Sequence, residues 1–306
     1  MDPRAGKPKL LSLFANWYSG ATLFTILLDR HTEIVSNGES MFFFEEDERR
    51  YDCTCGRYID ECEFYRATAA HMRRADGAGW DRRLFVQVPH FSRQPLLGSL
   101  LNSWRLEGAL RNRLMSVVPS WRRTRDRFLD AQLAFFENAR RFAGASLYLD
   151  GTKSIRRAQL LARDARSEMK VLHLIRDGRG FCASYTRNEN SRPSPAEAAV
   201  RWLRYIEQVD GFSRAYPSVP VLTIRYEDLC RSTEETLRGI CRFLEIPHED
   251  LTAGTTKQAH ILGHDMRKTF DGKIVENARW KETLDPRTQA ELTARMQDAL
   301  GRFGYL

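Results

Sequence analysis

The sequence has no long apolar run, and none approaches the roughly 20 residues that a membrane-spanning helix needs. The chain is therefore predicted not to span a membrane. Residues 1–9 are polar and lack the basic-then-apolar order of a secretory signal peptide. A cytoplasmic location is the expectation from these two absences.

The CxxC spacing is also absent, although the chain has six cysteines. Cys53, Cys55 and Cys62 cluster, but a tetrahedral zinc site needs a fourth ligand. His71 could serve as that ligand. Because no CxxC pair is present, we predict no bound metal and favour a reduced or locally disulfide-linked loop over a zinc site.

The ATPase phosphate-binding pattern GxxxxGK[ST] is missing as well, which argues against a P-loop kinase or nucleotidase. Positive charge is in excess, with 48 Lys and Arg against 40 Asp and Glu and a net charge of +8. Such a balance favours an anionic partner, either a nucleotide, a phosphorylated substrate, a nucleic acid or an acidic membrane surface. Charge alone does not choose among these partners.

Short apolar runs of the kind found in strands buried on both faces alternate with helical patterns. The predicted strands are residues 9–15, 34–36, 147–149, 170–175 and 219–225. This alternation predicts a P-loop-like, three-layer α/β fold with a central parallel sheet flanked by helices. We expect a single domain over residues 1–306, with a basic helical insertion at residues 80–141.

The turn after the first strand has the chemistry of an anion site. It leads into a helix and consists of Tyr18, Ser19, Gly20, Ala21, Thr22 and Leu23. Backbone N–H groups at a helix N-terminus attract anions, and the hydroxyls of Ser19 and Thr22 add hydrogen-bond donors. An ordinary strand–helix turn capped by Ser19 is the alternative that this segment leaves open.

A second candidate site follows the strand at residues 170–175. The strand delivers Arg176 at its carboxyl end, and Ser184 follows two helical turns later. Ligands bind at that edge of an open α/β sheet, and arginine suits a phosphate because its planar fork donates two bonds at once. The alternative is a structural ion pair of Arg176 with Asp177 or another carboxylate.

In order and spacing, these segments resemble the superfamily of sulfotransferases that use 3'-phosphoadenosine 5'-phosphosulfate (PAPS). The resemblance is to the bacterial branch, which is related to carbohydrate and tyrosyl-protein sulfotransferases. The shared segments are Ser19-Gly20, Cys53-x-Cys55-Gly56 with Cys62-x-Phe64, Asp150-Gly151-Thr152-Lys153-Ser154, Arg176 with Ser184, Arg225-Tyr226-Glu227-Asp228-Leu229, His260 to Arg267 and Ala278 to Leu284. The resemblance covers residues 9–66 and 146–290 but not the basic insertion.

The resemblance implies transfer of a sulfuryl group from PAPS to an acceptor hydroxyl, giving a sulfate ester and the bisphosphate nucleotide PAP. It implies that the turn from Tyr18 to Leu23 holds the 5'-phosphosulfate, and that Arg176 and Ser184 hold the 3'-phosphate. The other cofactor contacts that it implies are Tyr226, Arg267 and Trp280.

One departure concerns the cation that the family usually has just before its Ser-Gly-Thr turn. Tyr18 stands at that position, and Ala21 replaces the usual first threonine. Negative charge builds on the bridging oxygen as the sulfuryl group leaves, so a cation there is chemically desirable. We predict that Lys153 supplies it, with Arg267 as the alternative. A catalytically impaired nucleotide-binding module is a competing interpretation.

The acceptor hydroxyl needs a base, and tyrosyl-protein and glycan sulfotransferases use a glutamate after the second strand. Glu39 stands at that position and is the predicted base. Histidine bases serve the cytosolic small-molecule branch. His31 precedes the second strand, but its segment resembles one that is structural in other members.

The acceptor itself is not identified by the sequence. A carbohydrate, a lipid or a natural product is favoured, and a peptide tyrosine stays open. The basic insertion is expected to cap the acceptor cleft, with its apolar residues in a core and its arginines solvated. Peripheral membrane contact is a further option for this stretch. No nucleic-acid partner is expected, and the sequence does not predict the oligomeric state.

Overall fold

The computed structural model describes residues 9–39, 51–73, 117, 119–188, 191–253 and 257–306. Its centre is a five-stranded parallel sheet with the strand order β2-β3-β1-β4-β5. The strands are β1 (Lys9–Ala15), β2 (Ile34–Ser36), β3 (Leu147–Asp150), β4 (Glu168–Ile175) and β5 (Val221–Arg225). The predicted α/β fold is confirmed, and the bounds of β1 and β2 are those that their apolar runs predicted.

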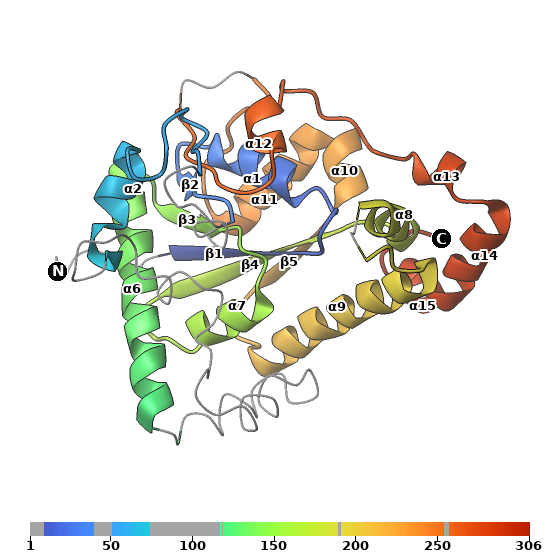
Figure 1. Ribbon diagram of the computed structural model, residues 1–306, viewed down its shortest axis with the longest axis horizontal. Helices are drawn as coiled ribbons and strands as arrows, with labels where there is room; N and C mark the ends of the chain where they lie inside the picture. The colour runs from blue at the N-terminus through green and yellow to red at the C-terminus, as the bar shows by residue number, and fades with distance from the viewer. Residues whose placement is uncertain (1–8, 40–50, 74–116, 118, 189–190, 254–256) are drawn as a thin grey trace.

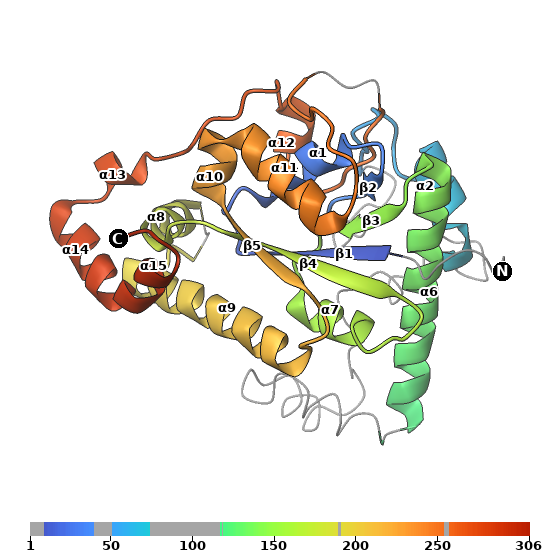
Figure 2. The same cartoon turned by 180° about the vertical axis from the view of Figure 1, so that it is seen from behind.

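Helices cover both faces of this sheet, as Figures 1 and 2 show from opposite sides. One face carries α1 (Ala21–Asp29), α10 (Tyr226–Arg231) and α11 (Thr233–Leu244). The other carries α6 (Pro119–Ala143), α7 (Ile155–Leu161) and α9 (Pro195–Ala215). The remaining helices are α2 (Glu63–Thr68), a 3-10 turn (Ala70–Met72), α8 (Gly178–Asn188), α12 (Met266–Thr269), α13 (Trp280–Thr283), α14 (Pro286–Arg295) and α15 (Gln297–Arg302).

The central strand β1 is buried on both faces, which explains its nearly continuous apolar sequence. Successive side chains of a strand point to opposite faces. Leu10 and Phe14 accordingly lie in the core beneath α6, α7 and α9, where the ring of Phe14 meets Phe212 edge-on at 5.0 Å. Leu11 and Leu13 lie in the core beneath α1 and α11. This strand therefore joins the two layers of helices.

The predicted insertion is only partly within the described residues, since 80–116 and 118 lie outside them. Its last part begins α6, which buries Trp121 and Phe128 in the core while Arg122, Arg123 and Arg127 are exposed. The helix thus has its apolar side in the core and most of its arginines in solvent, as expected. No helix among the described residues is long and apolar enough to cross a bilayer.

The strand order places a ligand-binding edge next to β1. The chain passes from β1 to β2 and β3 on one side of it, and then crosses to β4 on the other side. Ala15 at the end of β1 is in register with Leu174 near the end of β4. Ligands of open α/β sheets bind in the crevice at the carboxyl ends of strands where the order reverses. The residues that follow β1 and β4 are therefore the first candidates for a site.

Candidate functional site

The turn between β1 and α1 depends on a glycine. Gly20 has φ 84° and ψ 13°, in the left-handed region where residues with a Cβ are disfavoured. A Cβ on Gly20 would also lie 2.5 Å from Cδ2 of Tyr226. The close approach of Tyr226 and the backbone conformation both require glycine, so this turn is tightly packed against α10.

The start of α1 offers hydrogen-bond donors to an anion. The first N–H groups of a helix have no intrahelical acceptor, and in α1 these belong to Ala21, Thr22 and Leu23. Ser19 precedes them, is 1% exposed, and its Oγ has no hydrogen-bond partner among the described residues. A buried hydroxyl without a partner is costly, and an oxygen-rich ligand would satisfy it. The sequence left open that Ser19 caps the helix. The N-cap of α1 is instead Gly20, and no side chain makes a capping hydrogen bond to the helix.

Arg176 follows β4 and connects the segments of the site. One guanidinium nitrogen donates to the carbonyl oxygen of Tyr18 at 2.7 Å and to Oγ of Ser184 at 3.2 Å. The other terminal nitrogen donates to the carbonyl oxygen of Asn277 at 2.6 Å, and the group lies 5.1 Å from the ring centroid of Tyr226. Arg176 and Ser184, which were predicted to hold the same phosphate, thus lie in direct contact.

The charge of Arg176 is not neutralised by a carboxylate among the described residues, although the side chain is 5% exposed. Asp177, the predicted alternative partner, instead pairs with Arg179 at 2.7 Å. Carbonyl and hydroxyl oxygens satisfy the hydrogen bonds of a guanidinium but leave its charge, which favours binding of an anion. The structural ion pair with Asp177 that the sequence left open is therefore absent.

Trp280 and Tyr226 close the site from the C-terminal part of the chain. Trp280 is 8% exposed, and the guanidinium of Arg179 lies 4.8 Å from its ring centroid. A Cβ on Gly180 would lie 2.9 Å from Trp280, so α8 approaches this ring closely. Burial raises the pKa of Tyr226 to about 12, and its neutral hydroxyl donates to the carbonyl oxygen of Val275 at 3.3 Å.

Glu39 and Lys153, the two predicted catalytic residues, touch each other. Nζ of Lys153 lies 2.7 Å from Oε1 of Glu39, and the side chains are 10% and 13% exposed. Lys153 has φ 59°, as does Tyr18, and only two other described residues besides glycine have positive φ. Such backbone conformations concentrate at functional sites. The sequence predicted the two residues separately but gave no signal for their contact.

Close backbone packing positions Glu39 at the end of β2. Gly38 pairs with Leu262 in an isolated parallel bridge, and the N–H of Glu39 donates to the carbonyl oxygen of Leu262 at 3.2 Å. A Cβ on Gly151 would lie 2.7 Å from the carbonyl oxygen of Gly38. The loop that carries Lys153 and the segment around Leu262 therefore hold Glu39 from two sides.

A buried ion pair fixes the loop that carries Lys153. The carboxylate of Asp150 accepts from Nε of Arg157 at 2.7 Å and from the hydroxyl of Thr152 at 2.8 Å. Arg157 is completely buried and also donates to the amide oxygen of Gln132. The pair joins the end of β3 to α7 beneath the loop.

Replacement of Asp150 by asparagine is expected to lower the free energy of unfolding by about 3–5 kcal/mol, because Arg157 keeps a buried charge without its partner. Urea denaturation followed by circular dichroism measures this loss. Glu234→Gln breaks the exposed pair with Arg238 and should cost less than about 1 kcal/mol. A loss below about 1 kcal/mol for Asp150→Asn would contradict the role given to this pair.

An open cleft of about 1330 Å³ begins beside Lys153. Asn16 at the end of β1, Lys153 and Tyr185 line it, and α9 forms a large part of its wall. Six basic and two acidic side chains line the cleft: Lys153, Arg156, Arg201, Arg204, Arg214 and Arg295, and Glu197 and Glu207. The sequence analysis did not select Asn16 or the α9 arginines, because exposed arginines on a helix have no distinguishing local pattern.

Arg267 lies apart from the other predicted cofactor contacts. Its guanidinium donates to the carbonyl oxygens of Gly263 at 2.6 Å and Asp52 at 3.0 Å. The side chain is 2% exposed and lies 5.2 Å from the ring centroid of Tyr51. These contacts join the segment after β2 to α12, and none is with the turn after β1. Lys153 is therefore the better candidate for the catalytic cation.

Neither His31 nor His260 is placed as a base. His31 is completely buried, with Nε2 2.9 Å from the carbonyl oxygen of Pro247 and Nδ1 accepting from the N–H of Glu33 at 3.0 Å. His260 faces Cys53 and Cys62. The structural interpretation of His31 agrees with these contacts, and Glu39 is left as the candidate base.

The architecture and the site together define a class of protein. A three-layer α/β fold with a glycine turn after β1 and an arginine after β4 that has no carboxylate partner among the described residues is typical of proteins that bind phosphate-bearing ligands. The sulfotransferase family matches residues 16–250 of the chain. The chain therefore belongs to the sulfotransferase family, whose members transfer sulfuryl groups.

Solved structures of sulfotransferases are similar to the chain at low sequence identity. The sulfotransferase domain from the curacin biosynthetic pathway matches with a TM-score of 0.51 and 15% identity over 95% of this chain and 98% of that one. The sulfotransferase domain of the Synechococcus PCC 7002 olefin synthase matches with a TM-score of 0.48 and 17% identity over 97% and 98% of the two chains. Mouse sulfotransferase SULT7A1, solved with PAP, matches with a TM-score of 0.40 and 12% identity over 99% and 90%. No curated protein sequence matches the chain.

Proposed function

We propose that this protein transfers the sulfuryl group of PAPS to a hydroxyl group of an acceptor, releasing PAP and a sulfate ester. The observation that carries the proposal is the uncompensated Arg176, which contacts both Ser184 and the turn after β1. The buried Ser19 hydroxyl without a partner supports an oxygen-rich ligand at that turn. The two features fit the two phosphate-bearing ends of PAPS.

Each residue then has a defined task. Ser19 and the N–H groups at the start of α1 bind the 5'-phosphosulfate, which supplies the sulfuryl group. Arg176 and Ser184 bind the 3'-phosphate, and Tyr226 and Trp280 enclose the nucleotide. These four side chains are buried, and low exposure strengthens each charge-assisted bond.

Glu39 and Lys153 act at the two ends of the sulfuryl transfer, Glu39 on the acceptor and Lys153 on the leaving group. The carboxylate of Glu39 takes the proton of the acceptor hydroxyl, and the ammonium of Lys153 stabilises negative charge on the bridging oxygen of the leaving group. Their 2.7 Å contact holds the carboxylate and the ammonium side by side in a largely buried position. The cleft that Lys153 lines is the entrance for the acceptor, and its excess of basic side chains favours an acceptor with a carboxylate or phosphate.

Thermal unfolding with ligands tests the nucleotide assignment. PAP should raise the melting temperature, because a ligand that binds only the folded state stabilises it by mass action. Adenosine, which has neither phosphate, should leave the melting temperature almost unchanged. Greater stabilisation by ATP with Mg²⁺ than by PAP would support a P-loop-type kinase instead.

Transfer of radiolabel from PAPS into an extract of the native host tests the reaction. Mass spectrometry of the labelled product identifies the acceptor and shows whether it carries a carboxylate or phosphate. Turnover should not require Mg²⁺. Tight PAP binding without transfer to any acceptor would favour the catalytically impaired nucleotide-binding module, for which Tyr18 in place of a cation is the specific observation.

A further inference from the structure

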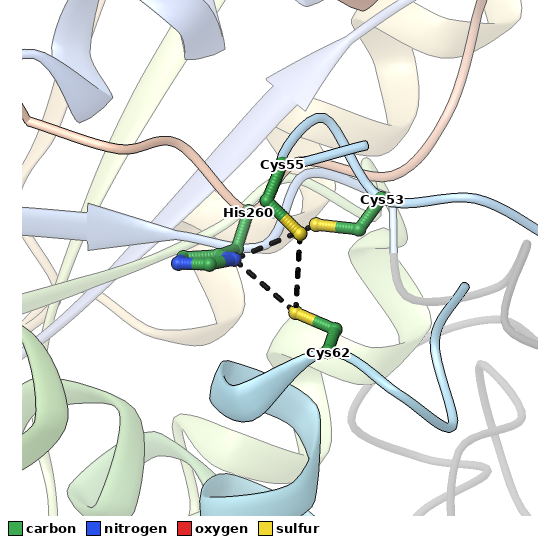
Figure 3. Close-up of side chains that lie close together, drawn as sticks. All are labelled: Cys53, Cys55, Cys62 and His260. Carbon is green, nitrogen blue, oxygen red and sulfur yellow. Dashed lines mark hydrogen bonds between the residues drawn. The ribbon is translucent and has the colours of Figure 1, made fainter. Parts of the chain in front are cut away.

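Three cysteines and a histidine converge outside the proposed catalytic site, as Figure 3 shows. Cys53 and Cys55 lie in the loop before α2, Cys62 is the N-cap of α2, and His260 comes from a segment almost 200 residues later. Their Sγ and Nδ1 atoms all lie within 4.8 Å of one another. Cys53 and Cys62 are buried, and the other two are partly exposed.

The spacing of these atoms fits a tetrahedron around one metal ion. Zinc bonds of about 2.3 Å to sulfur and about 2.0 Å to nitrogen separate two sulfurs by about 3.8 Å, and a sulfur from a nitrogen by about 3.5 Å. The observed separations from Nδ1 of His260 are 3.5 Å to Cys53 and 3.3 Å to Cys62. Sγ of Cys55 lies 3.6 Å from Sγ of Cys62.

A disulfide does not explain the cluster. All three cysteines are free, and 3.6 Å between two sulfurs is far longer than the roughly 2.05 Å of a disulfide bond. A disulfide between two of the three would also leave one thiol and the inward-facing imidazole without a role. The locally disulfide-linked loop that the sequence allowed is therefore not the arrangement observed.

His260 is held with its Nδ1 toward the sulfurs. Its ring stacks on Phe64, with a centroid separation of 4.9 Å and an interplanar angle of 7°. Its carbonyl oxygen accepts from the hydroxyl of Tyr65 at 2.6 Å. On either side of it, Thr54 donates to the carbonyl oxygen of Ala259 at 2.6 Å and accepts from the N–H of Ile261 at 2.9 Å.

We propose that Cys53, Cys55, Cys62 and His260 bind one zinc ion in a structural site. Four protein ligands leave no open position, which is the pattern of structural rather than catalytic zinc, and thiolates select a soft metal ion. The expectation of no metal came from the absence of a CxxC pair, with His71 as the candidate fourth ligand. His71 does not supply it, since its Nε2 lies 2.9 Å from the carbonyl oxygen of Ala131, and His260 does.

The ion connects the cysteine loop to the segment that positions Glu39. Leu262, two residues after His260, pairs with Gly38 and accepts the N–H of Glu39. The hydroxyl of Tyr51 also donates to the carbonyl oxygen of Gly263 at 3.2 Å. Zinc at this junction would therefore fix the backbone beside the candidate base without touching the acceptor.

Metal analysis of the full-length protein tests the proposal directly. Protein made in zinc-containing medium should hold about one zinc per chain, and Cys62→Ser and His260→Ala should each lose most of it. Cys241→Ala is the matched control, because Cys241 is a buried thiol in α11 outside the cluster, and its zinc content should be that of the wild type. Replacement of zinc by Co²⁺ should give the absorption spectrum of a tetrahedral thiolate site.

The proposal can also be tested on the wild-type protein alone, so a variant that folds poorly does not affect this second test. A chelator should lower its melting temperature, and added Zn²⁺ but not Mg²⁺ should restore it. The absorption bands of the Co²⁺-loaded wild type should be absent from the spectrum of Co²⁺-treated Cys62→Ser. Wild-type protein that contains no zinc above background, or a chelator without effect on the melting temperature, would overturn the proposal, whatever the outcome of the PAPS experiments.

Discussion

Replacement of Glu39 by glutamine is expected to lower turnover by about 10²–10⁴-fold, the usual contribution of a general base. The substitution keeps the shape of the side chain but removes the proton acceptor. PAP affinity should stay nearly unchanged, because the carboxylate contacts Lys153 and the residues proposed to bind the nucleotide lie after β1 and β4. Steady-state kinetics with PAPS and an acceptor, together with calorimetric titration of PAP, measure the two quantities.

Glu33→Gln is the matched control for this experiment, since Glu33 precedes the opposite end of the same strand β2. Its turnover should equal that of the wild type. Lys153→Met removes the ion-pair partner of Glu39 but keeps its carboxylate, so this variant distinguishes loss of the base from loss of the ion pair. Turnover of Glu39→Gln close to the wild-type value would rule out the base role, and an acceptor acidic enough to need no base would then be the next hypothesis.

Replacement of Arg176 by alanine is expected to weaken PAP binding by about 1.5–3 kcal/mol, the contribution of a hydrogen bond to a charged group. That corresponds to a loss of affinity of roughly 10- to 150-fold. Binding of an analogue without the 3'-phosphate should change little, because Arg176 is assigned to that phosphate alone. Calorimetric titration of the two nucleotides gives the comparison.

The control is Arg187→Ala, which removes an exposed arginine from the same helix α8 that carries Ser184. PAP should bind this variant as it binds the wild type. Arg176 also donates to the carbonyl oxygens of Tyr18 and Asn277, so its loss could loosen the site as a whole. Equal losses for both nucleotides would show such a loosening and would contradict the assignment to the 3'-phosphate.

The contact between Lys153 and Glu39 bears on the missing cation at Tyr18. An ammonium paired with a carboxylate has less net charge to offer a leaving oxygen than a lone one. In the proposed reaction Glu39 takes a proton from the acceptor, which neutralises its own charge and increases the attraction of Lys153 to a developing anion. Proton transfer and charge stabilisation would therefore be linked through one ion pair, which offers a reason for activity without a cation at position 18.

Much of the fold could be predicted because its signals are local. A strand buried on both faces needs a short continuous apolar run, and the runs that became β1 and β2 had the observed bounds. Gly20 and Ser19 were recognisable for a similar reason, since a turn into a helix N-terminus restricts its residue types. The spacing from Arg176 to Ser184 is likewise local, because two turns of α8 bring the side chains together.

Three contacts could not be predicted, and each joins segments that are distant in the sequence. His260 meets the cysteines, Lys153 meets Glu39, and Arg176 meets Asn277 only in the folded chain. Sequence proximity favoured His71 as the fourth ligand, but that ring lies against the carbonyl oxygen of Ala131. Residue types and their periodicity were enough to predict the strands of the sheet and to select the two candidate anion sites. The order of strands in the sheet and the packing of loops at its carboxyl edge decided which charged and ligating side chains meet, because those distances depend on the whole topology and not on any local pattern.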